Sequence, residues 1–275
     1  MQSWQVRIAP SLGSGFAGTP KKVWGTGSYK SDTEPTVFFG LYGLPDFFAL
    51  WRHKGRRAIL WAGSDITHFK KGYWLDSEGR LRIEPHQLAQ WINENCESYV
   101  ENEVEQAELL HFGITSKVVP SFLGDVKKFP LRFKPQGITK LYTSVSGNDF
   151  KLYGWDKIEE LSDQYPEVEF HLYGNSIPWY TDRPNIVVHG RVTHKEMNDQ
   201  IKKMTGAIRL TEHDGFSEIL AKSILWGQWP VSPYIYYPHI ATRIDEVLGK
   251  KEPNTEGRNY YLNIVNKYPW NDKVN

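Results

Sequence analysis

RLTEHDGFSEILAKSILWGQWPVS, residues 209–232, contains the clearest structural pattern in the chain. It begins like the end of a strand, turns at Asp214-Gly215, and continues with apolar residues at helical spacing until Gly227. Glu212, His213 and Asp214 therefore meet at one strand-to-helix turn. In parallel α/β sheets such turns, at the carboxyl ends of the strands, are the usual positions of ligand sites.

The rest of the chain repeats this alternation of short apolar runs and longer helical patterns, which is typical of βα units around parallel sheets. The helical pattern at residues 102–114 has Gly113 as its stop signal. The main strand patterns lie at residues 4–10, 36–43, 56–66, 116–122, 138–146, 168–174, 185–191, 206–212 and 229–235. The fold class that we expect is therefore α/β.

The 275 residues are enough for two domains, because one domain usually takes about 100–200 residues. Residues 124–137, GDVKKFPLRFKPQG, carry Lys, Arg, Pro and Gly without a regular period, which favours a linker. The same strand and helix pattern restarts beyond it. We expect one α/β domain over residues 1–130 and a second over residues 131–255.

The composition limits the classes of partner. Hydrophobic residues make up 40% and charged residues 24%, as in folded globular proteins. A net charge of +1 gives no global case for nucleic acid or for an anionic membrane, so any basic site must be local. The aromatic content of 14%, with 11 Trp, suits an ordinary core as well as stacking on sugar rings.

The compartment is expected to be the cytoplasm. Cys96 is the only cysteine, which excludes an intramolecular disulfide and a cysteine-based zinc cluster. No run approaches the about 20 apolar residues needed to cross a bilayer, and the N-terminus lacks the apolar core of a signal peptide.

Two glycine-rich or basic turns are candidates for ligand contacts. In SLGSGFAG, residues 11–18, Gly13, Ser14 and Gly15 either let backbone amides approach a ligand or form a flexible loop. The spacing also matches a dinucleotide-binding pattern, but a clear acidic residue about 20 positions later is missing. Lys151, at the head of a predicted helix, is either a phosphate-binding cation or a solvated side chain.

The turn at residues 212–217 allows similar alternatives. Asp214 could cap the following helix, which would leave the amides of Gly215, Phe216 and Ser217 as an anion site. Glu212 and His213 could transfer protons or hold sugar hydroxyls. The simpler interpretation is a capping aspartate beside two solvated polar side chains.

The second half of the chain resembles the C-terminal, donor-binding domain of GT-B glycosyltransferases, particularly the retaining branch that uses nucleotide sugars. That family carries Glu-Gly-Phe, a second Glu eight positions after the first, and then Gly-x-Pro-Val. Here Asp214-Gly215-Phe216, Lys222-Ser223 and residues 227–231, GQWPV, occupy these positions. The loop at residues 11–18 and WAGSDI, residues 61–66, resemble loops of the N-terminal domain.

The resemblance implies two Rossmann-like domains that face each other across a cleft, with a C-terminal tail, residues 256–275, that is helical and packs back toward the first domain. It implies transfer of a sugar from a nucleotide diphosphate sugar to a glycan, lipid-linked or other acceptor, with retention, and no metal or cofactor apart from the donor.

Glu212, His213 and Asp214 would orient the transferred sugar. The implied donor-binding residues are Lys151, Gly215, Phe216, Ser217, Glu218, Lys222, Arg191 and Arg209, and the implied acceptor-side residues are Gly13, Ser14, Gly15 and Asp65. The expected partners are a nucleotide sugar and a carbohydrate or glycolipid, without nucleic acid. The resemblance is also compatible with a peripheral membrane contact and with a homo-oligomer.

Two departures from the family pattern bear on function. The family has an arginine several residues before the lysine that Lys151 matches. This chain lacks that arginine, so Arg191 or Arg209 would have to replace it. Lys222 stands where the family has a ribose-binding Glu, and a lysine can only donate hydrogen bonds. It could instead pair with Glu218 on the helix surface. These departures keep open a GT-B scaffold that binds a glycan or a protein without transfer, and a hydrolase or epimerase of the same architecture.

Overall fold

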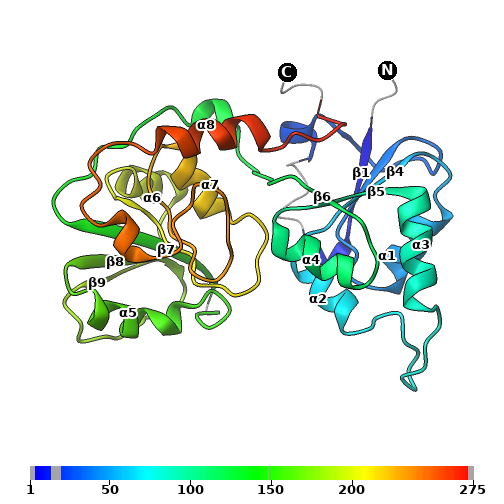
Figure 1. Ribbon diagram of the computed structural model, residues 1–275, viewed down its shortest axis with the longest axis horizontal. Coiled ribbons are helices and arrows are strands. Elements are labelled where there is room, and N and C mark those ends of the chain that lie inside the picture. The colour runs from blue at the N-terminus through cyan, green and yellow to red at the C-terminus, as the bar shows by residue number, and fades with distance from the viewer. Residues whose placement is uncertain (1–3, 14–19, 148, 272–275) are drawn as a thin grey trace. The chain divides into compact units, whose positions relative to one another are not determined.

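The computed structural model describes residues 4–13, 20–147 and 149–271, and the chain divides into two compact units (Figure 1). Unit 1 comprises Met1–Gly124 together with Ile264–Asn275, and unit 2 comprises Asp125–Asn263. The chain thus leaves unit 1 after Gly124, whereas the predicted domain boundary was at residue 130. The return to unit 1 occurs at Ile264, where we expected the tail to begin at residue 256.

In the described part of unit 1, six parallel strands form one sheet in the order β2-β1-β3-β4-β5-β6. The strands are short, and each strand predicted in this half of the chain contains one of them. Their bounds are β1 Gln5–Ile8, β2 Gly27–Ser28, β3 Thr36–Phe39, β4 Arg57–Leu60, β5 Cys96–Val100 and β6 Lys117–Val118.

Alternate residues of these strands are buried on opposite faces of the sheet, because side chains along a strand point to opposite sides. Phe38 and Ile59 pack with residues of the unit's helices, and Val37 and Leu60 pack in a second cluster. The helices are α1 Leu44–Arg52, α2 Ser64–Lys70, α3 Pro85–Asn95 and α4 Glu103–His111, with shorter helical turns at Pro10–Leu12 and Pro20–Trp24.

The returning C-terminal segment completes the second cluster of unit 1. The rings of Tyr268 and Trp270 are stacked, with centroids 4.6 Å apart, and both are buried. Asn266 exchanges two hydrogen bonds with the backbone of Phe122, at 2.9 and 2.8 Å. This segment is therefore part of the core of unit 1.

In the described part of unit 2, four parallel strands form a sheet in the order β10-β7-β8-β9. Val231 extends the sheet by bridges to Ile208 and Ala241. The strand predicted at residues 229–235 is reduced to this bridge, because Pro230 and Pro233 lack the N–H that a strand needs. The bounds are β7 Thr139–Gly147, β8 Val168–Asn175, β9 Ile186–Gly190 and β10 Gly206–Ala207.

An apolar cluster of unit 2 includes Leu141, Phe170, Leu172 and Ile208. The helices of this unit are α5 Ile158–Gln164, α6 His194–Ile201, α7 Glu218–Leu225 and α8 Thr255–Ile264, with 3-10 turns at Val126–Lys128, Trp155–Lys157 and Ile244–Val247. Across the described residues, no helix has the length and apolarity required to span a bilayer.

Candidate functional site

The carboxyl edge of the unit 2 sheet collects the predicted donor-side residues. Because the strands are parallel, all of them end at the same edge, where the following loops converge. Lys151 follows β7, Arg191 follows β9, and residues 209–218 follow β10. Lys222 lies further along, within α7.

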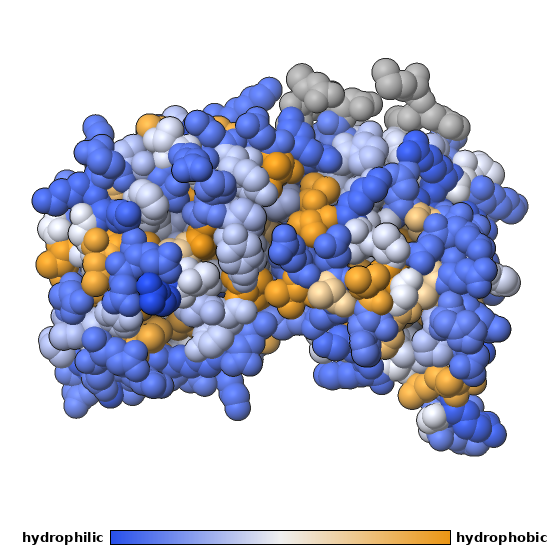
Figure 2. All heavy atoms as spheres, in the orientation of Figure 1, coloured by the Kyte–Doolittle hydropathy of each residue, from blue (hydrophilic) through white to orange (hydrophobic). Residues whose placement is uncertain are grey.

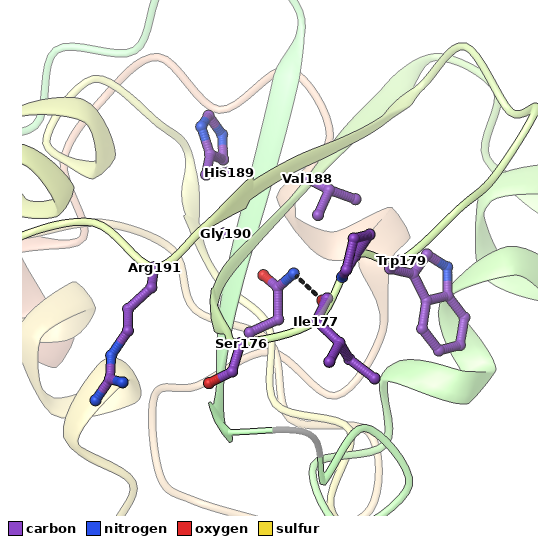
Figure 3. Close-up of a pocket in the computed structure, with 9 residues that line it drawn as sticks. Ser176, Ile177, Trp179, Val188, His189, Gly190 and Arg191 are labelled. Carbon is purple, nitrogen blue, oxygen red and sulfur yellow. Dashed lines mark hydrogen bonds between the residues drawn. The ribbon is translucent and has the colours of Figure 1, made fainter.

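A pocket of about 590 Å³ lies at this edge (Figure 3). Ile177, Trp179 and Val188 give it apolar walls. The side chains of Ser176 and Arg191 point toward the carboxyl end of β7, whereas the ring of His189 points the other way (Figure 3). Its full lining is Asn175, Ser176, Ile177, Pro178, Trp179, Val188, His189, Gly190 and Arg191.

Two polar atoms of the pocket residues have unmet hydrogen-bonding capacity. Asn175 is buried and donates from Nδ2 to the carbonyl of Ile177 at 2.8 Å. Its Oδ1 is also buried and, among the described residues, accepts no hydrogen bond; the indole N–H of Trp179 likewise has no acceptor. Buried polar groups are normally satisfied, so one acceptor and one donor are left for a ligand or for water. Sequence reasoning missed this pocket except for Arg191, since Asn175 and Trp179 belong to no motif.

Arg209 and Asp214 form an ion pair in the segment after β10, in which Arg209 is buried and Asp214 is half-buried. The guanidinium donates from Nε and from a terminal nitrogen to Asp214 Oδ2, at 2.7 and 2.6 Å. It also lies 4.6 Å from the ring centroid of Tyr153. The other oxygen, Oδ1, accepts from the amide of Gly215 at 3.1 Å. Arg209, whose side chain is only 9% exposed, therefore holds the Asp214 carboxylate in a fixed orientation.

Gly154 explains why the segment after β7 lies against the segment after β10. Its φ of +70° is in the left-handed region, and a Cβ at this position would lie 2.2 Å from the carbonyl oxygen of Leu210. Only glycine permits both features. This contact brings Tyr153 and Lys157 next to residues 209–212.

Lys157 pairs with Glu212 and was not predicted. Its Nζ donates to Glu212 Oε1 at 2.6 Å and lies 3.9 Å from the ring centroid of Tyr234. The ammonium group holds the pKa of Glu212 below its usual range. Lys151, by contrast, is exposed and lies in the turn before the helix, which begins with the 3-10 turn at Trp155–Lys157. The sequence places Lys157 on a helix, but no local signal pairs it with Glu212.

The helix after the 212–217 turn begins later than the sequence suggested. α7 starts at Glu218, and Ser217 is its N-cap residue, so Asp214 binds Arg209 and does not cap the helix. The Phe216 ring is buried and stacks on Tyr261, with centroids 5.0 Å apart. The Phe216 side chain therefore belongs to the core and does not contact a ligand.

His213 and Lys222 are both half-buried. Lys222 lies within α7, one turn after Glu218.

A line of hydrogen-bonded side chains crosses one face of the sheet and ends at a pocket strand. Lys140 and His171 both donate to Glu169 Oε1, at 2.8 and 2.7 Å, and His171 Nδ1 lies 2.8 Å from His189 Nε2. The His189 ring stacks on Tyr173 at 4.2 Å. Burial lowers the pKa of His171 to about 4 and also lowers the pKa of His189.

The acceptor-side residues predicted in unit 1 are placed differently. Asp65 is fully buried, and its two carboxylate oxygens accept from the amides of Leu41 and Ala62, at 2.8 and 2.9 Å. Burial raises the pKa of Asp65 to about 6. Its carboxylate thus fastens the end of β3 to the loop after β4, and it could meet a ligand only by giving up these bonds. Gly13 is exposed with a φ of +68°, and Ser14 and Gly15 lie outside the described residues.

A resident metal ion has no obvious set of ligands within the described ranges. They contain no group of three His, Cys, Asp or Glu side chains that could hold one. The charged groups at the sheet edge include the two ion pairs described above.

Comparison with known proteins rests on structure alone. No protein-family model matches the chain, and no curated protein matches its sequence. Among solved structures, a mutant of TarM from S. aureus in complex with fondaparinux, α-GlcNAc-glycerol and UDP matches with a TM-score of 0.56 and 13% identity over 89% of this chain. The lipopolysaccharide outer core galactosyltransferase WaaB, in its apo form, matches with a TM-score of 0.51 and 12% identity over 86% of this chain. The GtfA/B complex matches with a TM-score of 0.50 and 10% identity over 86%.

These three proteins are GT-B glycosyltransferases. The chain has the GT-B fold. The expectation of two Rossmann-like α/β domains is confirmed for each unit by the parallel sheets and by these matches. The chain spans 54% of the TarM structure, 82% of WaaB and 55% of the GtfA/B chain. At this low identity, the likeness establishes the GT-B fold of the chain and nothing finer.

Proposed function

We propose that the chain is a glycosyltransferase that moves a sugar from a nucleotide diphosphate sugar to a carbohydrate or glycolipid acceptor. The observation that carries this proposal is the carboxyl edge of the unit 2 sheet. That edge carries both a pocket with unmet hydrogen-bonding groups and the fixed Arg209–Asp214 pair, in a chain with the GT-B fold. UDP is present in the TarM structure that this chain resembles.

The nucleoside would occupy the pocket of residues 175–191. Trp179 and Val188 would contact the base, and Asn175 Oδ1 would accept a hydrogen bond from it. Arg191, which is exposed at the pocket, and Lys151, which is exposed after β7, would meet the diphosphate. Such cations stabilise the negative charge that develops on the leaving diphosphate, which is the main demand of this transfer.

The transferred sugar would lie against the 212–217 turn. Asp214 would accept a sugar hydroxyl while Arg209 holds its orientation, and Glu212 and His213 would line the same turn. We further propose a hexose as the transferred group, retention at the anomeric carbon, and chemistry without a metal, as the sequence resemblance implies. The amides of Gly215, Phe216 and Ser217 would face the phosphate side of the donor.

The test is calorimetric titration with UDP, GDP and ADP, followed by product analysis with the matching sugar donors. One of these nucleotides should bind, and replacing Arg191 by Ala should weaken that binding roughly tenfold or more, because a charge-assisted phosphate contact is lost. Arg243→Ala, an exposed arginine of unit 2 away from the pocket, is the control and should bind as the parent does.

The titration also separates transfer from the alternatives. A chain that binds a glycan but none of the nucleotides would be a carbohydrate-binding protein on a GT-B scaffold, and the proposal would be wrong. Release of free sugar from the donor, with no transfer to any acceptor offered, would indicate a hydrolase.

A further inference from the structure

Two tyrosines are exposed in the segment of unit 2 that follows Val231. Tyr234 is 46% exposed and Tyr236 is 57% exposed, whereas their neighbours Ile235 and Tyr237 are buried. The segment therefore presents two aromatic rings to solvent while the residues between and after them join the core. Neither exposed ring lines the pocket to which the nucleoside is assigned.

The backbone that carries these rings is fixed by hydrogen bonds. The Tyr237 hydroxyl donates to the carbonyl of Gly215, which ties the segment to the 212–217 turn. The hydroxyl of Tyr261, on α8, donates to the carbonyl of Pro238 at 2.8 Å. A ligand that covers the exposed rings therefore meets a backbone that is already ordered, so little conformational entropy is lost on binding.

The Tyr234 ring adjoins the 212–217 turn through a charged pair. Lys157 Nζ lies 3.9 Å from the centroid of this ring and donates to Glu212 Oε1 at 2.6 Å. The Glu212 side chain is largely exposed, so its other oxygen can accept a hydrogen bond from a ligand hydroxyl. Because the carboxylate neutralises the ammonium group, the pair adds no net charge beside the ring.

A second carboxylate lies at the other end of the segment. Glu256, on α8, is exposed, and its Oε1 lies 3.7 Å from His239 Nδ1. In chain order, the two exposed rings thus lie between two hydrogen-bonding ends. Neither end offers a cation without a carboxylate nearby, so the segment does not favour a phosphate-bearing partner.

The exposed groups of the segment suit an uncharged, hydroxylated ligand. In residues 232–240 both isoleucines are buried, so the exposed side carries no branched aliphatic side chain, on which a lipid or an apolar protein surface would pack. On the face of the molecule drawn in Figure 2, apolar residues lie in separate patches among hydrophilic ones. A tyrosine ring packs against the C–H groups of a sugar ring, while the hydroxyls of that sugar reach neighbouring carboxylates.

We propose that the surface formed by Tyr234, Tyr236 and Glu212 binds a neutral oligosaccharide, whose sugar rings stack on the two tyrosines. The Cα atoms of the tyrosines are at most about 7 Å apart, because two residues of chain span no more, so one oligosaccharide can meet both rings. The surface adjoins the turn that we assign to the transferred sugar. The role of the bound chain as the acceptor rests on the proposed function, whereas its binding does not.

Calorimetric titration of the full chain with cellohexaose, chitohexaose and maltohexaose, without nucleotide, tests the proposal. At least one of these neutral chains should bind. Tyr234→Ala and Tyr236→Ala should each weaken that binding about threefold or more, and the double variant about tenfold or more, because the stacking contacts are lost. Tyr234→Phe/Tyr236→Phe should bind within about twofold of the parent, since stacking requires the ring and not the hydroxyl.

Tyr180→Ala is a matched control in the same unit. Tyr180 is 86% exposed and follows β8, whereas the segment with Tyr234 follows Val231, which extends the sheet beyond β10. This variant should bind oligosaccharide as the parent does. Equal losses in the control, no binding of any of the three probes, or a concentration-dependent dimer that the double alanine variant abolishes would each overturn the proposal.

The nucleotide titration keeps this inference distinguishable from the proposed transfer. A chain that binds UDP, GDP or ADP but none of the oligosaccharides would contradict the tyrosine surface and leave the transferase proposal standing. A chain that binds an oligosaccharide through the two tyrosines but no nucleotide would contradict transfer and leave the tyrosine surface standing.

Discussion

His171 has a hydrogen-bond partner on each ring nitrogen, and this arrangement decides how it responds to acid. Nε2 donates to Glu169, so Nδ1 accepts from His189. A proton added to His171 must enter at Nδ1, where it would face the N–H of His189. Burial and this geometry therefore keep the imidazole neutral, and its pKa falls to about 4.

The lowered pKa of His171 makes stability depend on pH. Unfolded histidine binds its proton below about pH 6.5, whereas folded His171 binds it only near pH 4, so stability is full above pH 6.5 and is lost as the pH falls toward 4. At pH 5 the loss due to this residue should be roughly 2 kcal/mol. His171→Gln should flatten urea-derived stability between pH 4 and 6.5, while His194→Gln, an exposed histidine on α6, should not. An unchanged slope in His171→Gln would contradict the assignment.

Individual site residues were predictable to the extent that they belong to a local pattern. Arg209, Glu212 and Asp214 stand at a strand-to-helix turn, and the chain direction alone places them at the carboxyl edge of a sheet. Their ion-pair partners were not predictable. Lys157 approaches Glu212 across 55 residues of sequence, and Asn175 lines a pocket without belonging to any motif.

At the scale of elements, Gly154 sets the contact between the turn after β7 and the strand end after β10. Gly154→Ala should lower the free energy of unfolding by at least about 2 kcal/mol, because the methyl group meets the Leu210 carbonyl and φ is positive. Gly137→Ala is a matched control in the same unit, with a φ of +74° and no atom near the added Cβ, and should cost about 1 kcal/mol. Denaturant unfolding compares the two. Equal losses would show that the close approach to Leu210 adds nothing.

The elements themselves were largely predictable, and their ends were not. The helical pattern at residues 102–114 predicts α4, and the pattern that follows Asp214-Gly215 predicts α7. The start of α7 was misplaced because Asp214, a good capping residue, binds Arg209 instead. That choice depends on a strand residue whose position is fixed by tertiary packing, which local sequence does not contain.

At the scale of the whole molecule, unit 1 is built from two separate parts of the chain. The chain leaves it at Gly124 and returns at Ile264, after all of unit 2. Tyr268 and Trp270 then pack on Tyr99, with ring centroids 5.6 and 5.1 Å away. The sequence resemblance implied a tail, residues 256–275, that packs back toward the first domain. Its burial in the core was not predictable, because it depends on contacts such as Phe122–Asn266, 144 residues apart.

Removing one ring of this segment tests whether it stabilises unit 1 in particular. Trp270 is 4% exposed, so Trp270→Ala should destabilise unit 1 by about 3–5 kcal/mol, through lost burial and the cavity left behind. Hydrogen exchange read by mass spectrometry should show faster exchange in β1, β3 and β4 and unchanged protection in β7 and β8, since those strands belong to unit 2. Trp51→Ala, which removes a half-exposed ring from the same unit, should cost well under half as much. Equal loss of protection in both units would mean that they unfold as one cooperative structure, and the returning segment would then stabilise the chain as a whole.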